Sequence, residues 1–348
     1  MCDELGLMRR ALELAALGPA VDPNPRVGAV ISDPAGRVVG EGFHRGAGHP
    51  HAELEALAVA GRRARGGTAV VTLEPCDHTG RTSPCSLALL DAGVARVVYA
   101  QNDPNPKATG GAVRLRAGGV AVVGGVLTDR ARDLNADWTF AMTHGRPRVV
   151  WKFAATLDGR SAAADGTSRW ITGPAARADV HRLRAQAGAI LVGTGTVLAD
   201  DPALTVRRPD GAPEQRQPLR VVMGRRVPPA TARVLDGAAT TLHVRERDPA
   251  VVLDILAEHE IRRVWLEGGP TVAAAFLNAG LVDEVIAYLA PTLLGSGPPA
   301  VGDLGIATLR QAVRLQPLEI TTLGPDIRLR ASIHHHRPHP RDVTCSPE

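Results

Sequence analysis

Strand-length apolar runs alternate with helical segments along most of this chain, and this alternation constrains its fold more than any other feature. In the first half, RVGAVISD and RVVGEGFH flank the turn PAGR and predict a β-hairpin. A helix is expected over 3–18 and another from about Pro50 to Ala60. TAVVTLE, ARVVYAQ and VAVVGGV then predict strands, with a helix over 84–92 after the first and a loop before the last. This order indicates a layered α/β domain with much parallel pairing.

The segment MTHGRPRVVWKFAAT marks a domain boundary, because Gly145 and Pro147 punctuate it and a new strand is expected from about Arg148. The same rhythm then repeats, with helices across 174–187, 249–259 and 271–279 and final strands near 317–332. The strands between them are expected at RVVWKFAATL, AILVG, LRVVM, TTLHV, RRVWLEGG and EVIAYLAP. A chain of 348 residues is too long for one ordinary core. We therefore expect one domain over residues 1–146 and a second over 147–333.

Two polar stretches are expected to lack regular structure. RRPDGAPEQRQP, at 207–218, predicts a loop. Residues 334–348, HHHRPHPRDVTCSPE, show no apolar periodicity and are expected to form a disordered tail. Adventitious metal binding by its histidines is the alternative.

Composition excludes several classes of protein. Aromatic residues make up only 3% of the chain, so the cores must be built from Ala, Val and Leu. The 40 basic and 36 acidic residues leave a net charge of +4, a small excess that suits anionic small molecules better than a nucleic acid. The chain contains no run of about 18 apolar residues, which argues against a membrane span. The start MCDELGLMRR contains acidic residues and is unlike a signal peptide.

The four cysteines do not make a disulfide framework in a chain of this length. Cys2 and Cys345 lie near the ends, whereas Cys76 and Cys85 form a close pair. A metal-bound pair in a reducing cytoplasm is favoured over a disulfide. We therefore expect a cytoplasmic protein.

That pair completes a split set of residues typical of a catalytic zinc site. His51, Cys76 and Cys85 offer one imidazole and two thiolates, which are three of the four corners of a tetrahedral Zn²⁺ site. An open fourth corner distinguishes a catalytic zinc from a structural one, and zinc lowers the pKa of water there towards about 7. Glu53, two residues after His51, has no obvious ligand role and is free to transfer protons. The same division of labour operates in zinc nucleobase deaminases.

Two features of this set need separate comment. Cys85 follows Pro84 at the start of an expected helix, whose N-terminus is expected to lower the thiol pKa. Eight residues separate Cys76 from Cys85, whereas the usual deaminase signature closes with C-x-x-C. Taken alone, His51 is also explained as a core histidine, and Cys76 and Cys85 as buried thiols.

With that spacing, the motifs NPRVGAVI, HAELEAL, TLEPCDHTGRTSPC and DPNPKATGG resemble the deaminase half of the bifunctional riboflavin-biosynthesis deaminase/reductase family. The resemblance implies a cytidine-deaminase-like α/β/α layer domain whose substrate is a diaminohydroxy-pyrimidinone with a phosphoribosylamino group. It implies that Asn24 holds the pyrimidine and that His78, Thr79 and Arg81 face the ribose phosphate. A surface arginine is the alternative for Arg81. Asp103, Asn105 and Lys107 are weaker candidates, since DPNP is also good turn chemistry.

Two glycine turns in the second half are candidate phosphate sites. No G-x-G-x-x-G follows a strand, so a Rossmann site is not indicated. LVGTGTV at 191–197 comes close, and in LEGGPTVAAAFL a strand runs into Gly268-Gly269 before a helix. Exposed amides at a helix N-terminus suit a pyrophosphate, and a tight turn without a ligand is the alternative.

The wider pattern resembles the reductase half of the same family, through KFAATLDGRSA, SRWITG, HRLRAQAGAILVGTGTVLADDPALTVR, WLEGGPTVAAAFL and DEVIAYLAPTLLG. It implies a dihydrofolate-reductase-like α/β domain that uses NADPH to reduce the ribosyl group to ribityl. The residues implied for the cofactor are Ala155, Trp170, Thr196, Asp200, Gly269, Pro270, Thr271, Val272, Ala273, Ala274 and Ala275. Those implied for the substrate are Lys152, Ser168, Arg184, Leu204, Arg207 and Glu267. The alternative to a cofactor contact by Trp170 is an aromatic residue of the core. Asp158 in TLDGR is a further candidate, and its alternative is a turn residue.

The sequence thus predicts a cytoplasmic two-step enzyme of riboflavin synthesis with Zn²⁺ and NADPH as cofactors. We expect a small-molecule phosphoribosyl-pyrimidine substrate, no nucleic-acid or membrane partner, and a homo-oligomer, dimer or higher. One rival is another zinc nucleobase or nucleoside deaminase fused to an unrelated binding domain. The other is a zinc-stabilised regulatory or binding protein without catalysis.

Overall fold

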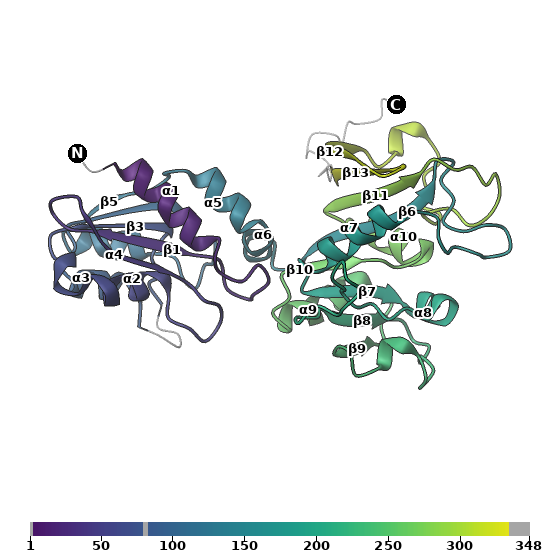
Figure 1. The fold of residues 1–348 in the computed structure, drawn as a ribbon, viewed down its shortest axis with the longest axis horizontal. Coiled ribbons are helices and arrows are strands. Elements are labelled where there is room, and N and C mark those ends of the chain that lie inside the picture. Colours follow the sequence, from purple (N-terminus) through teal and green to yellow (C-terminus); the bar gives the residue numbers. More distant parts are fainter. Residues whose placement is uncertain (1–2, 79–82, 334–348) are drawn as a thin grey trace, which may run out of the picture. The chain divides into compact units, whose positions relative to one another are not determined.

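The computed structural model describes residues 3–78 and 83–333, and the chain divides into two compact units (Figure 1). Unit 1 ends at Arg146 and unit 2 begins at Pro147. Thr79, Arg81 and the expected tail over 334–348 lie outside the described residues. Within those residues, no helix is both long and apolar enough to cross a membrane.

Unit 1 is a five-stranded sheet between two layers of helices. The strand order is β2-β1-β3-β4-β5, in which β1 pairs antiparallel with β2 and β3, while β3, β4 and β5 run parallel. The strands are β1 (Gly28–Ser32), β2 (Val38–Phe43), β3 (Thr68–Leu73), β4 (Arg96–Gln101) and β5 (Ala121–Val123). The predicted hairpin is therefore confirmed as β1–β2.

Alternate residues of these strands pack against different helices, as the pleat of a sheet requires. Val30, Val70 and Val98 pack on one face with α1 (Glu4–Ala15) and α5 (Thr128–Leu134). The opposite face packs against α2 (Ala52–Ala60), α3 (Cys85–Asp91) and α4 (Gly111–Ala117). The helix α6 (Ala136–His144) precedes unit 2, and the 3₁₀ turn η1 (Gly61–Ala64) follows α2.

Unit 2 is built on an eight-stranded sheet in the order β12-β13-β11-β6-β10-β7-β8-β9. The six strands from β11 to β9 run parallel, and β13 and β12 extend the sheet antiparallel. The strands are β6 (Arg148–Thr156), β7 (Ala189–Gly193), β8 (Leu219–Met223), β9 (Thr241–Val244), β10 (Arg263–Leu266), β11 (Glu284–Ala290), β12 (Leu315–Leu323) and β13 (Asp326–Ile333). In a parallel sheet, all carboxyl ends lie at one edge, where ligands usually bind.

Helices cover both faces of this sheet. One face packs against α7 (Pro174–Arg184), and the other against α9 (Pro249–Glu258) and α10 (Pro270–Asn278). The short helix α8 (Thr194–Asp200) follows β7, and the 3₁₀ turns are η2 (Arg233–Leu235) and η3 (Leu309–Gln311). Both units thus confirm the α/β class predicted from the alternation of strands and helices.

Several short helices differ from the sequence expectation. The segment before β5 was expected to be a loop but contains α4, which buries Ala112 and Leu115. The polar segment after β7 forms α8, which buries Val197 and ends at Asp201 in the left-handed conformation (φ 41°). These two helices offer few periodic positions and lack a starting signal such as the Pro84 that precedes α3, and they depend on tertiary packing for stability.

Candidate functional site

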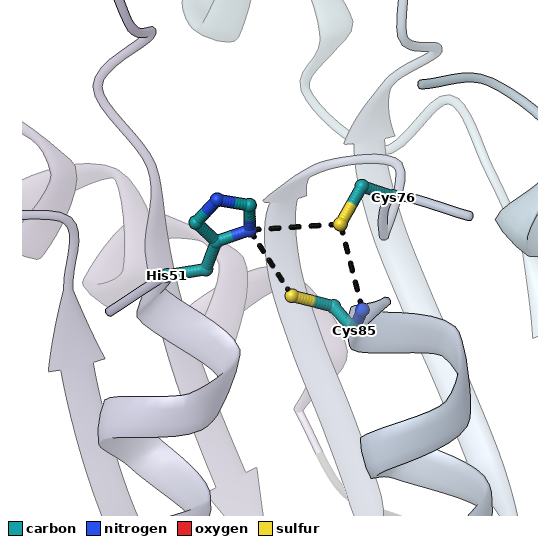
Figure 2. Close-up of side chains that lie close together, drawn as sticks. All are labelled: His51, Cys76 and Cys85. Atoms are coloured by element: carbon teal, nitrogen blue, oxygen red, sulfur yellow. Dashed lines mark hydrogen bonds between the residues drawn. The ribbon is translucent and has the colours of Figure 1, made fainter. Parts of the chain in front are cut away.

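Three side chains from separate segments of unit 1 meet at one edge of the sheet. His51 immediately precedes α2, Cys76 lies in the loop after β3, and Cys85 begins α3 (Figure 2). His51 Nδ1 lies 3.2 Å from Cys85 Sγ and 3.5 Å from Cys76 Sγ. All three donor atoms lie within 4.8 Å of one another.

This donor set fits a zinc ion. Bond lengths of about 2.0–2.1 Å for Zn–N and 2.3 Å for Zn–S place tetrahedral N and S ligands about 3.6 Å apart, close to the two separations found here. The backbone N–H of Cys85 also donates to Cys76 Sγ at 3.4 Å, which places a donor beside a prospective thiolate. Because this cluster of described residues supplies three donors, one tetrahedral position is left for water or substrate.

Glu53 lies beside the three donors but is not one of them. Its side chain is buried in the first turn of α2, with only 4% of the residue exposed. Burial raises the pKa of Glu53 to about 7, although the nearby His51 ring opposes the rise. A carboxyl group with a pKa near neutrality exchanges protons readily in both directions.

The two thiols differ in their electrostatics. A hydrogen bond from Cys85, together with one from His51, lowers the pKa of Cys76, whereas hydrogen bonding to Cys76 and burial raise the pKa of Cys85. Cys85 is the first residue of α3, at the helix N-terminus where the sequence predicts it. Zinc binding requires both thiols to lose their protons.

A buried carboxylate braces the loop that carries Cys76. Glu74 Oε1 accepts the backbone N–H of Ala112 at 3.1 Å, and Oε2 accepts that of Asp103 at 3.3 Å. A Cβ atom at Gly111 would clash with the Pro75 carbonyl oxygen, so glycine allows α4 to approach this loop. No sequence motif predicts these contacts, which join residues 29 and 38 positions apart.

A second brace joins the same loop to α3. Asp77 Oδ1 accepts the Ser86 hydroxyl at 2.6 Å and also the guanidinium of Arg114. Because Asp77 follows Cys76 and Ser86 follows Cys85, these contacts fix the spacing of the two thiols. Sequence reasoning missed Asp77, Ser86 and Arg114.

Several candidate substrate residues of unit 1 lie around this centre, of which Asn24 is the one expected to hold the pyrimidine. Asn24 Nδ2 lies 3.1 Å from His44 Nε2, and the His44 ring contacts the His51 ring edge-on at 5.5 Å between centroids. Burial raises the pKa of Asp103 to about 6, and the same carboxyl interacts electrostatically with Cys76 and His51. His78 is half-buried, and its Nδ1 has no hydrogen-bond partner among the described residues.

In unit 2, three of the expected substrate residues form one charged group where the carboxyl end of β10 lies beside the middle of β6. Arg184 donates from Nε to Glu267 Oε1 at 2.7 Å and from Nη2 to Glu267 Oε2. Burial would raise the pKa of Glu267, but the charges of Arg184 and Lys152 outweigh it and lower that pKa to about 2. Burial lowers the pKa of Lys152, and Glu267 opposes this shift. The fully buried Trp265, which the sequence did not single out, also donates from Nε1 to Glu267.

The segment with Leu204 and Arg207 is held against this group. Arg184 Nη1 donates to the Thr205 carbonyl at 3.2 Å, and the Arg207 backbone N–H donates to His181 Nδ1 at 3.2 Å. Leu204 is buried in the left-handed conformation (φ 49°), and Arg207 is exposed. His181 was also missed, and its pKa is lowered to about 4 by burial and by the charge of Arg184.

Most of the expected cofactor residues lie in α8 and at the start of α10. The Gly269 backbone N–H donates to Thr196 Oγ1 at 3.2 Å, which joins the start of α10 to α8. Residues 270–275 form the first turns of α10, Ala155 is buried in β6, and Asp200 ends α8. The Asp200 carbonyl accepts a hydrogen bond from Arg169.

Ser168 and Trp170 line an open pocket of about 200 Å³ together with Thr156 and Thr292. Trp170 is 70% exposed, with the Arg177 guanidinium 4.6 Å above its ring. Trp170 is therefore not a core residue. Asp158, by contrast, accepts backbone N–H groups of Leu294 and Gly295, which fits the turn alternative.

Comparison with known proteins covers both units. A family model of the cytidine and deoxycytidylate deaminase zinc-binding region matches residues 1–101, and a model of the RibD C-terminal domain matches 147–329. The riboflavin biosynthesis protein RibD of Mycobacterium tuberculosis is 52% identical over 308 residues, which cover 88% of this chain and 90% of that protein. RibD of Escherichia coli is 45% identical over 357 residues, covering 92% of this chain and 97% of that protein.

Solved structures agree over nearly the whole chain. Acinetobacter baumannii RibD has a TM-score of 0.85 and 40% identity, covering 95% of this chain and 99% of that one. A Thermotoga maritima protein, titled a diaminohydroxyphosphoribosylaminopyrimidine deaminase/5-amino-6-(5-phosphoribosylamino)uracil reductase, has a TM-score of 0.81, 33% identity and the same coverage. The chain therefore belongs to the RibD family of riboflavin-biosynthesis proteins and combines a zinc-binding deaminase domain with an NADPH-dependent RibD reductase domain.

Proposed function

We propose that unit 1 deaminates 2,5-diamino-6-(5-phosphoribosylamino)pyrimidin-4-one and that unit 2 then reduces the ribosyl group of the product to ribityl. The observation that carries the first step is the meeting of His51, Cys76 and Cys85 with the buried Glu53 beside them. Support for the second step comes from the similarity of residues 147–329 to the RibD reductase domain. The domains are residues 1–146 and 147–333.

In the first step, His51, Cys76 and Cys85 hold the zinc ion. When bound, zinc lowers the pKa of water towards about 7 and so supplies a nucleophile at neutral pH. Glu53 takes a proton from the attacking water at a carboxylate oxygen and delivers it to the departing amino group, which leaves as ammonia. Burial around Glu53 keeps bulk water from competing for that proton.

Three residues of unit 1 are assigned to substrate binding: Asn24, His78 and Arg81. Asn24, positioned by its contact with His44, holds the pyrimidine ring. His78 and Arg81 bind the ribose phosphate, and the Nδ1 atom of His78 is a buried group without a partner among the described residues. These roles follow the family motif residue by residue.

In the second step, charged groups hold the anionic substrate while NADPH, when bound, supplies the hydride. Arg184 and Arg207 offer guanidinium donors to the substrate phosphate, Lys152 and Glu267 complete the charged group, and Ser168 and Leu204 line the site. Glu267 neutralises part of the buried positive charge and orients Arg184 through two hydrogen bonds. The cofactor lies along Ala155, Trp170, Thr196, Asp200 and the turn over 269–275.

The protein acts in the cytoplasm as a homo-oligomer, dimer or higher, without a nucleic-acid partner. Support for a reducing compartment comes from the assignment of Cys76 and Cys85 as metal ligands, because thiols that hold a metal must stay reduced. Light scattering of the purified chain measures the oligomer directly.

The Glu53→Gln variant tests the proposed proton transfer. It removes the ionisable oxygen while keeping the size of the side chain, so we expect zinc content to remain unchanged and ammonia release to fall by about 10²–10⁴-fold. Cys85→Ser is the matched comparison, because it should lose both zinc and ammonia release. Undiminished ammonia release by Glu53→Gln would contradict the role given to Glu53.

A further inference from the structure

Exposed arginines follow two neighbouring strands at the carboxyl edge of the unit 2 sheet. Arg225 and Arg226 come directly after Gly224 at the end of β8, and Arg245 and Arg247 follow β9. The adjacent acidic residues are Glu246 and Asp248. The segments that follow β8 and β9 therefore carry four guanidinium groups and two carboxylates.

Strand register places Arg226 beside the first turn of α8. Gly193 of β7 pairs with Met223 of β8, so Thr194 and Gly195 continue alongside Gly224 and the two arginines. A Cβ atom built on Gly224 would lie 2.8 Å from Thr194 Oγ1, and one built on Gly195 would lie 3.5 Å from Arg226 Nη2. The Arg226 guanidinium thus lies next to Gly195, one residue from Thr196 in the proposed cofactor site. Figure 1 shows α8 at the end of β7 and β8.

Sheet order then determines which end of the dinucleotide reaches this arginine. The proposed substrate group of Lys152, Arg184 and Glu267 lies at β6 and β10, so the nicotinamide end must lie there. The Gly269–Thr196 hydrogen bond joins the start of α10 to α8, which continues the cofactor path past β7. The next strand is β8, so the adenosine end meets the residues that follow Met223. This step rests on the proposed placement of the cofactor.

Arg226 differs from its neighbour Arg225 in its surroundings. Arg225 lies close enough to Glu246 to help lower the pKa of that carboxyl group, after the backbone N–H groups of Arg247 and Asp248. Arg226 forms no ion pair with any carboxylate in residues 3–78 or 83–333. Its charge is therefore available to an anionic ligand.

We propose that Arg226 binds the 2′-phosphate of NADPH and so determines the preference of unit 2 for NADPH over NADH. A guanidinium presents paired N–H donors that match the oxygens of a phosphate monoester. NADH has an uncharged hydroxyl group at the same position, so its binding gains little from the guanidinium charge.

The test compares Arg226→Gln with the wild-type full-length protein by titrating NADP⁺ and NAD⁺ without substrate. Charge-assisted hydrogen bonds of this kind correspond to about 10–100-fold in affinity. We expect the Kd for NADP⁺ to rise by about that factor and the Kd for NAD⁺ to stay within about twofold. Arg226→Lys should recover part of the NADP⁺ affinity, because it keeps the charge but loses the paired geometry.

Arg225→Gln is the matched control, since it removes the same charge one residue away and should leave the NADP⁺/NAD⁺ ratio unchanged. An unchanged ratio in Arg226→Gln, a parallel loss for both nucleotides, or an equal effect of Arg225→Gln would each overturn the assignment. Binding without turnover keeps this result separate from the proposed reduction, which NADPH oxidation by the wild-type protein tests on the deaminated substrate.

Discussion

Glu267 shows at the residue scale how a buried carboxylate is kept ionised. Both its oxygens accept hydrogen bonds from Arg184, Trp265 Nε1 adds a third, and Lys152 contributes charge. Breaking a buried pair by removing one partner leaves the other charge uncompensated, which is strongly destabilising. The geometry of Arg184, and with it the proposed substrate site, therefore depends on Glu267.

This arrangement predicts a pH dependence of stability. The folded pKa of Glu267, about 2, is lower than its ordinary value of 4.5, so its ionised form contributes stability above pH 4.5. That contribution falls as pH decreases from about 5 towards 2, because the unfolded chain binds the proton first. We expect Glu267→Gln to unfold at a lower temperature than wild type at pH 7, with the difference narrowing towards pH 3.5. Scanning calorimetry of the unit 2 transition measures this, and a difference that widened on acidification would contradict the assigned pKa.

Much of the candidate site followed from the sequence, but its supports did not. His51, Cys76 and Cys85 could be recognised because few residue types bind zinc and they occur at typical spacings. Asp77, Ser86 and Arg114 carried no such signal, since any hydrogen-bonding residue can brace a loop and the partners are distant in sequence. Trp265 and His181 were likewise hidden, because their role depends on which groups the sheet brings next to them.

At the scale of secondary structure, the long periodic elements and the proline-preceded α3 were predictable, but the short helices α4 and α8 were not. β6, α7 and α9 each show enough apolar repeats to be recognised in the sequence. α4 and α8 show too few, although α8 carries two proposed cofactor residues, Thr196 and Asp200. Their positions are set by packing against neighbouring strands.

The segment after α8 depends on one buried arginine of β8. Arg220, fully buried, donates from Nη1 to the Ala203 carbonyl at 3.2 Å and to Asp236 Oδ1 at 2.8 Å, and from Nη2 to the carbonyls of Asp236 and Ala239. Arg220 therefore connects the segment that leads to Leu204 with the loop that precedes β9. Its removal would leave these carbonyl groups and the Asp236 carboxylate without that donor.

We predict that Arg220→Met destabilises unit 2 and lowers its reductase activity, because the lost hydrogen bonds hold the segment before Leu204. Ammonia release by unit 1 should not change. Chemical denaturation measured with both activities tests this, and Arg310→Met, at an exposed position, is the control. Equal loss of both activities would show that Arg220 does not act on unit 2 alone.

At the scale of the whole molecule, two sites with different chemistry lie on separate compact units of one chain. Unit 1 offers a nitrogen–sulfur donor set with an adjacent carboxyl group, and unit 2 offers cationic residues and glycine turns at the carboxyl edge of a parallel sheet. The proposed product of the first site carries the phosphoribosylamino group that the second site reduces. The two activities should therefore be separable by cofactor.

The most direct measurement follows ammonia release and NADPH absorbance together while the full-length protein acts on the diaminohydroxy-phosphoribosylamino-pyrimidine. Without NADPH, we expect ammonia to be released and the deaminated, unreduced product to accumulate. With NADPH, we expect one equivalent of cofactor to be oxidised for each ammonia released, after a lag while the intermediate forms. NADPH oxidation without ammonia release, or ammonia release with no later oxidation, would contradict the account of two successive steps on one chain.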